Sequence, residues 1–334
     1  MGTTDLGPDT VTSLVEDAVT APSMHNAQPW RFVHRPGGDV IRLYGDPGRA
    51  MPESDPGHRA LHLGCGAALF NLRVAAAWRH WDATIRLLPD PGDPWELAEI
   101  RLHRGPGPQA DPDPDLHALH TALRRRHSSR FPYSDEPVPG PVLDGLSAAA
   151  LLEGCRLVVP GPWHTDTVLS LVRDSALFEA ADSAIRREIA AWTRTGSPGE
   201  GPVTEGIPAY AFGPRQFGVS APVRDFDALH RVADREAAVF EKRPQIVLLG
   251  TEGDGPADWL RAGQAMQRVL LRATLDGLAT SLISQPLEWT ELRDEAGDPV
   301  RVTGRVQMIV RIGYGPAGPA TPRRPVSEVL RFVE

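Results

Sequence analysis

Several residue types that active sites commonly depend on are scarce in this sequence. Its 334 residues include two cysteines, Cys65 and Cys155, and neither lies in a CxxC motif or at metal-ligand spacing from a histidine. We therefore expect no disulfide framework, no metal site, and a reducing cytoplasm as the compartment. Lys242 is the only lysine, which leaves little room for chemistry that forms a Schiff base.

Long hydrophobic runs and an excess of positive charge are also absent. The most apolar stretch, residues 60–78, is interrupted by His62, Asn71 and Arg73, so it does not predict a membrane span. The opening residues carry no basic-then-apolar signal pattern. The formal net charge of −8 argues against a nucleic-acid partner, although it is compatible with a local basic pocket for one phosphate.

The chain is long enough for two cores, and its prolines and glycines indicate where it divides. They concentrate at 105–114, where we place the boundary between a first half, 1–110, and a second half, 111–334. A second stretch rich in glycine and proline, about 196–224, carries Tyr210, Phe212 and Phe217. A stretch this long is typically a functional lid or a disordered loop, and its aromatic side chains favour a lid.

Hydrophobic periodicity and turn signals predict alternating helices and strands in both halves. Gly64 and Gly66 lie inside a helical pattern that no strand precedes, so they predict close helix–helix approach rather than a dinucleotide loop. The expected helices are 9–20, 55–81, one starting at 115, 137–150, 165–193, 225–240, 256–276 and 288–293. The expected strands are 30–35, 40–44, 83–88, 97–104, 155–159, 245–250, 280–284 and 306–312.

Two polar segments are candidates for a binding site. Residues 21–32 read Ala-Pro-Ser-Met-His-Asn-Ala-Gln-Pro-Trp-Arg-Phe, and the two prolines prevent a regular helix between them. The polar side chains there offer donors and acceptors to a planar heteroaromatic ligand, or form only a polar helix-to-strand turn. Residues 124–130 hold four arginines and two serines at a helix terminus, a pattern that suits a terminal phosphate or, alternatively, a solvated basic helix end.

Both segments resemble FMN-dependent nitroreductases. Residues 21–32 are similar, almost residue for residue, to the Pro-Ser-x-x-Asn-x-Gln-Pro-Trp segment of that superfamily, and most closely to its Acg subfamily. Arg126-His127-Ser128-Ser129-Arg130, followed by Asp135-Glu136-Pro137-Val138-Pro139, resembles the Arg-Ser segment with which those enzymes open. The resemblance implies that Arg126 and Ser128, with His127 between them, bind the FMN phosphate and ribityl, and that Arg130 lies nearer the pyrimidine ring. The first segment would add contacts from Pro22, Ser23, Met24, His25, Asn26 and Gln28.

Two later segments extend the resemblance. Gly313-Tyr314-Gly315, followed by a proline-rich stretch, is similar to the nitroreductase C-terminal segment, in which Arg323 is the matching phosphate arginine. Residues 277–286 resemble the strand along one flavin face and bring Leu282, Ser284 and Gln285 to the ring. The usual acidic-Gly pair is replaced there by Ser284-Gln285, so the contacts near the flavin N5 stay open.

The resemblance implies an α+β, nitroreductase-like fold in which two fused halves form an intramolecular pseudo-dimer with mostly antiparallel central sheets packed by helices. It implies one FMN per monomeric chain, with further oligomerisation possible, and NAD(P)H as the reductant of a nitro, quinone or related small-molecule acceptor. His25 is a candidate proton donor beside the ring. The alternative function is a flavin-sequestering protein whose lid closes over FMN, and a deazaflavin in place of FMN also stays open.

Overall fold

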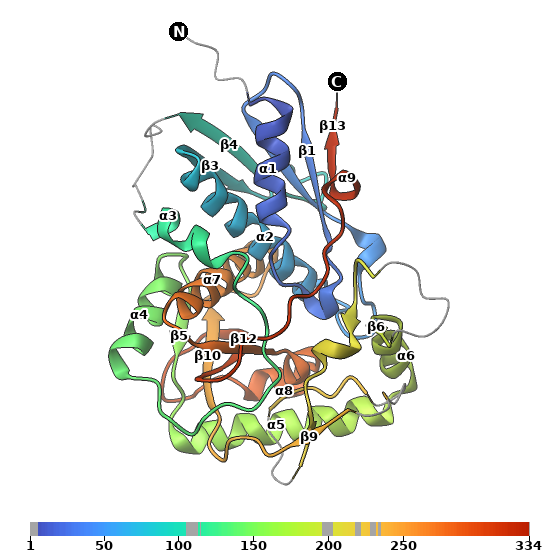
Figure 1. Ribbon diagram of the computed structural model, residues 1–334, viewed down its shortest axis with the longest axis vertical. Coiled ribbons are helices and arrows are strands. Elements are labelled where there is room, and N and C mark those ends of the chain that lie inside the picture. Colours follow the sequence, from blue (N-terminus) through green and yellow to red (C-terminus); the bar gives the residue numbers. More distant parts are fainter. Residues whose placement is uncertain are drawn as a thin grey trace.

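The computed structural model describes residues 6–104, 113, 115–195, 203–217, 222–227, 232 and 235–333. Its helices and sheets mix in an α+β fold, as expected (Figure 1). The helices are α1 Pro8–Ala18, α2 Arg59–Trp78, α3 Asp115–Leu119, α4 Gly140–Leu151, α5 Pro162–Ala181, α6 Ser183–Ala191, α7 Pro256–Leu275, α8 Thr290–Glu295 and α9 Val326–Val329. The longer strands are β1 Trp30–His34, β2 Val40–Gly45, β3 Trp81–Leu87, β4 Glu96–Arg104, β5 Arg156–Val158, β10 Gln245–Thr251, β11 Ala279–Ile283, β12 Arg305–Gly313 and β13 Leu330–Phe332.

Two sheets repeat one arrangement of strands. The first has the order β13-β1-β2-β4-β3 and the second the order β11-β12-β10-β5, so β1-β2-β4-β3 corresponds to β5-β10-β12-β11. Each set runs helix, two strands, a 20-residue helix and two strands, and all its pairings are antiparallel; in the second set, α5, α6 and the insertion lie between β5 and β10. The two fused halves expected from the resemblance thus have matching topologies. The C-terminal strand β13 joins the first sheet, parallel to β1, with Phe32 opposite Leu330.

Helices α2 and α7 pack against each other between the sheets and form the centre of the core (Figure 1). They approach most closely at Gly66 and Gly263. A Cβ on Gly66 would collide with the carbonyl of Leu260, and a Cβ on Gly263 with the carbonyl of Leu63. The contact is therefore reciprocal, as at a two-fold axis. It confirms that Gly66 serves helix packing.

The apolar character of α2 reflects its place in the core. This helix is long and apolar enough to cross a membrane, but 89% of its most apolar segment is buried inside the protein. Helices in the core of a protein can have the same length and composition as membrane-spanning helices, because they are apolar on every side.

One expected helix is wrong. Within 225–240, the described residues form no helix and instead contain β9 Ala237–Ala238, which pairs with β8 Arg215–Gln216. Asp227 accepts hydrogen bonds from Arg215 Nη2 at 2.6 Å and from the Val232 amide at 2.5 Å, so long-range pairing overrides the local helical periodicity. The remaining expected elements are confirmed to within a few residues.

Part of the predicted boundary and insertion lies outside the described residues, namely 105–112, 114, 196–202 and 218–221. The described residues of the insertion pack on a small core of their own. Ile207 and Phe212 pack there with Phe226 and with Ile185 and Ile189 of α6. This part of the insertion is thus folded, with β7 Ile207–Pro208 paired to β6 Thr193–Arg194.

Candidate functional site

The loop between α1 and β1 has an unusual backbone. His25, Asn26 and Gln28 adopt φ values of 47°, 57° and 54°, in the left-handed region that residues other than glycine rarely occupy. The Ser23 hydroxyl accepts a hydrogen bond from the Gln28 amide at 2.9 Å and helps to hold the turn. Left-handed residues persist only where their surroundings fix them, and they cluster at ligand sites.

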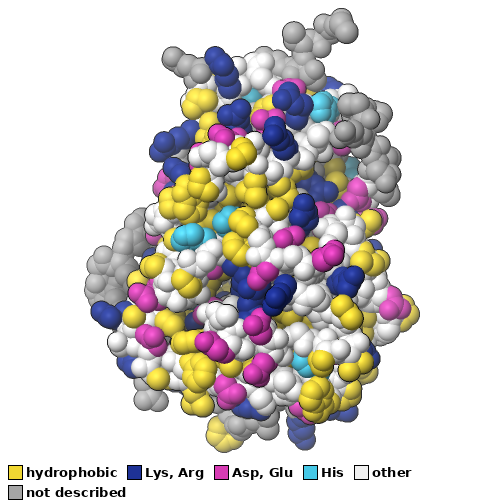
Figure 2. Space-filling view, turned by 180° about the vertical axis from the view of Figure 1, so that it is seen from behind, with side chains coloured by type: hydrophobic (Ala, Val, Ile, Leu, Met, Phe, Trp, Pro, Cys, Tyr) yellow, Lys and Arg dark blue, Asp and Glu magenta, His cyan; other side chains and the backbone are white. Residues whose placement is uncertain are grey.

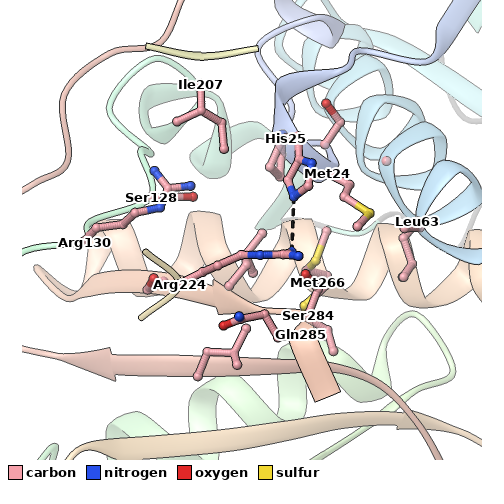
Figure 3. A pocket seen from close by; sticks show the side chains of 18 of the residues that line it. Met24, His25, Leu63, Ser128, Arg130, Ile207, Arg224, Met266, Ser284 and Gln285 are labelled. Atoms are coloured by element: carbon pink, nitrogen blue, oxygen red, sulfur yellow. Dashed lines mark hydrogen bonds between the residues drawn. The ribbon is translucent and has the colours of Figure 1, made fainter. Parts of the chain in front are cut away.

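A cavity with two arms lies beside this loop. Its outer arm is lined by Asn26, Arg126, His127, Pro319, Thr321 and Arg323. Its inner arm is lined by a larger group that includes Met24, Leu63, Met266, Met308, Arg224, Phe226 and residues 281–285 (Figure 3). The two arms adjoin each other, because they share the lining residues Pro22, Ser23, His25, Ser128, Arg130 and Ile207.

Besides Arg130, which lines both arms, the outer arm contains two arginines that form no ion pair with any described carboxylate. The buried Arg126 donates only one described hydrogen bond, from Nη2 to the Thr20 carbonyl at 3.4 Å, and its Nε has no partner. Burial, with the charge of Arg323 beside it, lowers the pKa of Arg126 to about 9. Burial also lowers the pKa of Arg323 to about 10. Two desolvated guanidinium groups facing one space form a site for a strongly anionic group.

Arg323 is fixed by the end of α1. Its Nε and Nη2 donate to the carbonyls of Val19, Thr20 and Ala21 at 2.8 to 3.2 Å, and its Nη1 donates to Asn26 Oδ1 at 3.0 Å. The carbonyls at a helix C-terminus carry partial negative charge. They orient the guanidinium without neutralising it as a carboxylate would.

The inner arm combines an apolar wall with fixed charges. Arg130 donates to the Ala211 carbonyl at 2.9 Å and lies 5.0 Å from the centre of the Phe226 ring. Burial and the nearby Arg224 lower the pKa of Arg130 to about 10. Met24, Met266 and Met308 supply polarisable, adaptable side chains to the same space. This chemistry suits a planar ring that gains negative charge.

His25 is neutral at pH 7 in this environment. Burial, with the charges of Arg224 and Arg130, holds its pKa well below 6.5. Its Nε2 lies 3.2 Å from Arg224 Nη1, and because a guanidinium only donates, Nε2 must be the accepting nitrogen. A neutral imidazole of this tautomer is a hydrogen-bonding group rather than a ready acid.

Asn26 and Gln28 both connect the insertion to the C-terminal segment. Asn26 Nδ2 donates to the carbonyls of Gly206, at 3.0 Å, and Pro322, at 3.1 Å. Gln28 Nε2 donates to the Thr204 carbonyl at 2.7 Å, while its Oε1 accepts from the Arg324 amide at 2.8 Å. Gln28 is fully buried and lies outside the lining of both arms. Its carboxamide therefore holds chain segments together.

Comparison with known proteins assigns the chain to a family. One solved structure, an FMN and NADPH-dependent nitroreductase NfnB from a Sphingopyxis strain, is 18% identical with a TM-score of 0.40, covering 65% of this chain and 99% of its own. The "Putative NAD(P)H nitroreductase Rv3131" of Mycobacterium tuberculosis is 34% identical over 98% of this chain and 92% of its own length. The "Putative NAD(P)H nitroreductase acg" of the same species is 31% identical over 96% and 95%. The model of the nitroreductase family matches residues 123–314, more than half of the chain. The chain belongs to the nitroreductase family.

In this nitroreductase-family protein, the residues expected from the sequence gather from distant segments. The cavity lining includes Pro22, Ser23, Met24, His25, Asn26, Arg126, His127, Ser128, Arg130, Leu282, Ser284, Gln285 and Arg323. Gln28 is the exception described above. Among the described residues, no group of histidines, cysteines and carboxylates is arranged to hold a metal ion.

Three lining residues in the insertion or just after it were not expected from the sequence: Ile207, Arg224 and Phe226. No local pattern marks Arg224 as a cavity residue, because only the fold brings it near His25. The aromatic content of the insertion was the one available signal that this segment covers something.

Proposed function

We propose that this protein is an FMN-dependent oxidoreductase that uses NAD(P)H to reduce a nitro, quinone or related small molecule. The carrying observation is the pair of arginines in the outer arm, Arg126 and Arg323, which have no described carboxylate partner. The family membership and the names of the two mycobacterial relatives support the use of NAD(P)H.

The residues present fit FMN from end to end. Arg126 and Arg323 would hold the phosphate, helped by the Ser128 hydroxyl at the junction of the arms. The inner arm, whose lining includes Met24 and Leu282, would hold the ring, and Arg130 would stabilise the negative charge that the ring gains on reduction. When bound, FMN supplies transfer of a hydride between the nicotinamide and the acceptor. The chain's residues position the ring and shield it from water.

A single chain would form the whole site, because its halves act as an intramolecular pseudo-dimer. The loop 21–28 comes from the first half, whereas Arg126, Ser128 and residues 282–285 come from the second. We retain the division at about residue 110, with β13 returning to the first sheet. We also propose the cytoplasm as the compartment, in keeping with two buried free cysteines.

The partners we propose are small molecules rather than nucleic acids. On the face seen in Figure 2, basic side chains gather near a hollow and acidic ones lie close beside them, without a broad basic stripe. Nucleic-acid binding surfaces are typically basic over a wide area.

The proposal is tested by measuring how much FMN the protein binds and whether NAD(P)H reduces the bound flavin. Purified protein, reconstituted with FMN, should take up one FMN per chain, and anaerobic addition of NADH or NADPH should bleach the flavin absorbance. A protein that binds neither FMN nor riboflavin would refute the assignment. Mass spectrometry of the chromophore released from the protein as purified, before any FMN is added, separates FMN from a deazaflavin.

A flavin-sequestering protein is the second candidate, favoured by one observation. Ile207 and Arg224 of the insertion, with Phe226 just after it, line the inner arm, so this segment would limit the room for a second ligand beside FMN. Sequestration predicts stoichiometric FMN that NAD(P)H fails to bleach, and bleaching that appears after residues 203–217 are replaced by a short linker. Prompt bleaching of the intact protein favours the oxidoreductase instead.

A further inference from the structure

Arg224 lines the inner arm and contacts side chains from three segments of the chain. Its Nη1 and Nη2 donate to the two carboxylate oxygens of Glu288, at 2.8 and 3.1 Å, and Nη2 lies 3.0 Å from Glu179 Oε2. Its Nη1 also reaches His25 Nε2 at 3.2 Å. In Figure 3 this contact lies between Ser128 and Arg130 on one side and Met24, Leu63 and Met266 on the other. Because His25 and Arg224 both line the inner arm, their contact is exposed to a ligand that enters it.

The contacts of Arg224 with the two glutamates are stronger than its contact with His25. Glu288 is fixed by the Ser284 hydroxyl at 2.8 Å, and Glu179 by Gln285 Nε2 at 2.9 Å. Two nearby carboxylates hold the Arg224 guanidinium through charge-assisted hydrogen bonds, which are the stronger kind. The contact with His25 is made to a neutral ring and is the longest of the four. A ligand therefore displaces Arg224 from His25 at much lower cost than from the carboxylates.

We propose that Arg224 recognises the ligand of the inner arm, and we call its contact with His25 the crossbar. A planar ligand that enters this arm breaks the His25–Arg224 contact, while Glu288 and Glu179 keep the guanidinium in place. The freed Nη1–H then donates to an oxygen or nitrogen acceptor on the ligand, such as a ring carbonyl. Arg224 becomes a specificity residue supplied by the insertion. This inference rests on the proposed function, since it takes FMN as the planar ligand.

The test measures how fast FMN binds to the apoprotein in the wild type, in two single variants and in the double variant. The quenching of flavin fluorescence in a stopped-flow instrument reports the binding. Arg224→Gln removes the charged donor. His25→Asn withdraws the acceptor from Arg224, because the shorter asparagine side chain ends well before the position of Nε2, and it keeps a residue that tolerates the left-handed backbone. Both should speed FMN association by about tenfold, because the entering ring no longer breaks a hydrogen bond to a charged group. The double variant should associate no faster than either single variant, since both changes remove one contact. At equilibrium, His25→Asn should bind FMN about tenfold more tightly, because the contact of Arg224 with the ligand no longer replaces one with His25, whereas the variants that lack Arg224 should show no such gain.

Arg215→Gln is the matched control. Arg215 belongs to the same insertion and pairs with Asp227 at 2.6 Å, but it lies outside the lining of both arms. Its removal loosens the insertion without touching the crossbar, so FMN association should keep the wild-type rate. The proposal is overturned if Arg215→Gln speeds FMN association as much as the other variants do, or if Arg224→Gln and His25→Asn leave the association rate unchanged. Wild-type protein that takes up no FMN refutes the proposed function itself, a distinct result.

Discussion

Replacing Arg126 with alanine separates the phosphate's contribution to binding from that of the ring. A hydrogen bond between a charged group and its partner contributes about 1.5–3 kcal/mol, so loss of the Arg126 contact should weaken FMN binding by about 10- to 150-fold. Riboflavin lacks the phosphate, and its affinity should stay within about twofold of wild type. Isothermal titration of both ligands measures the difference directly.

The same change should stabilise the protein in the absence of ligand. Arg126 is buried, makes one long described hydrogen bond, and has its pKa lowered to about 9 by burial and by Arg323. The folded state therefore bears the cost of an unpaired charge that the unfolded state leaves in water. Alanine removes this cost, so the melting temperature of the apoprotein should rise while FMN affinity falls.

Arg125→Ala is the control, because Arg125 is exposed and carries the same charge one residue away. It should change neither FMN affinity nor melting temperature appreciably. Equal losses of FMN and riboflavin affinity in Arg126→Ala, or a less stable apoprotein, would refute the assignment of Arg126 to a phosphate. A residue with a purely structural role would lower stability and affinity together.

Three further predictions concern packing, pH and thiols. Gly263→Ala should cost about 1–3 kcal/mol of unfolding free energy, because its Cβ would meet the Leu63 carbonyl, whereas Gly145→Ala in α4 meets nothing and should stabilise by about 0.5–1 kcal/mol in urea melts. Burial lowers the pKa of His25 below the 6.5 of the unfolded chain, so the unfolded state gains protons first and stability should fall as pH drops below 6.5, by up to about 1.4 kcal/mol per pH unit. His25→Asn should flatten that slope in melts at several pH values; an unchanged slope counts against a neutral His25. Burial raises the pKa of both Cys65 and Cys155, so neither thiol should react with a disulfide reagent until the protein unfolds, and rapid labelling of native protein would contradict their placement.

The sequence by itself determined the elements and the main ligand-binding segments. Prolines 22 and 29 predict the break between α1 and β1, and helical periodicity predicts α2 and α7 closely. These features follow from local rules of backbone geometry and hydrophobic spacing, which act over a few residues. The motif around residues 21–32 also indicated the kind of ligand, because its residue types match one family.

Only the tertiary structure decided how the side chains are used. Gln28 was expected at the flavin, yet its carboxamide faces Thr204 and the Arg324 amide, segments more than 170 residues away. Arg224 carries no local signal, and it became a cavity residue through Glu179, Glu288 and His25, which come from three separate elements. The expected helix at 225–240 failed for the same reason. Side-chain direction and long-range ion pairs depend on the assembled fold, so the local periodicity of the sequence does not predict them.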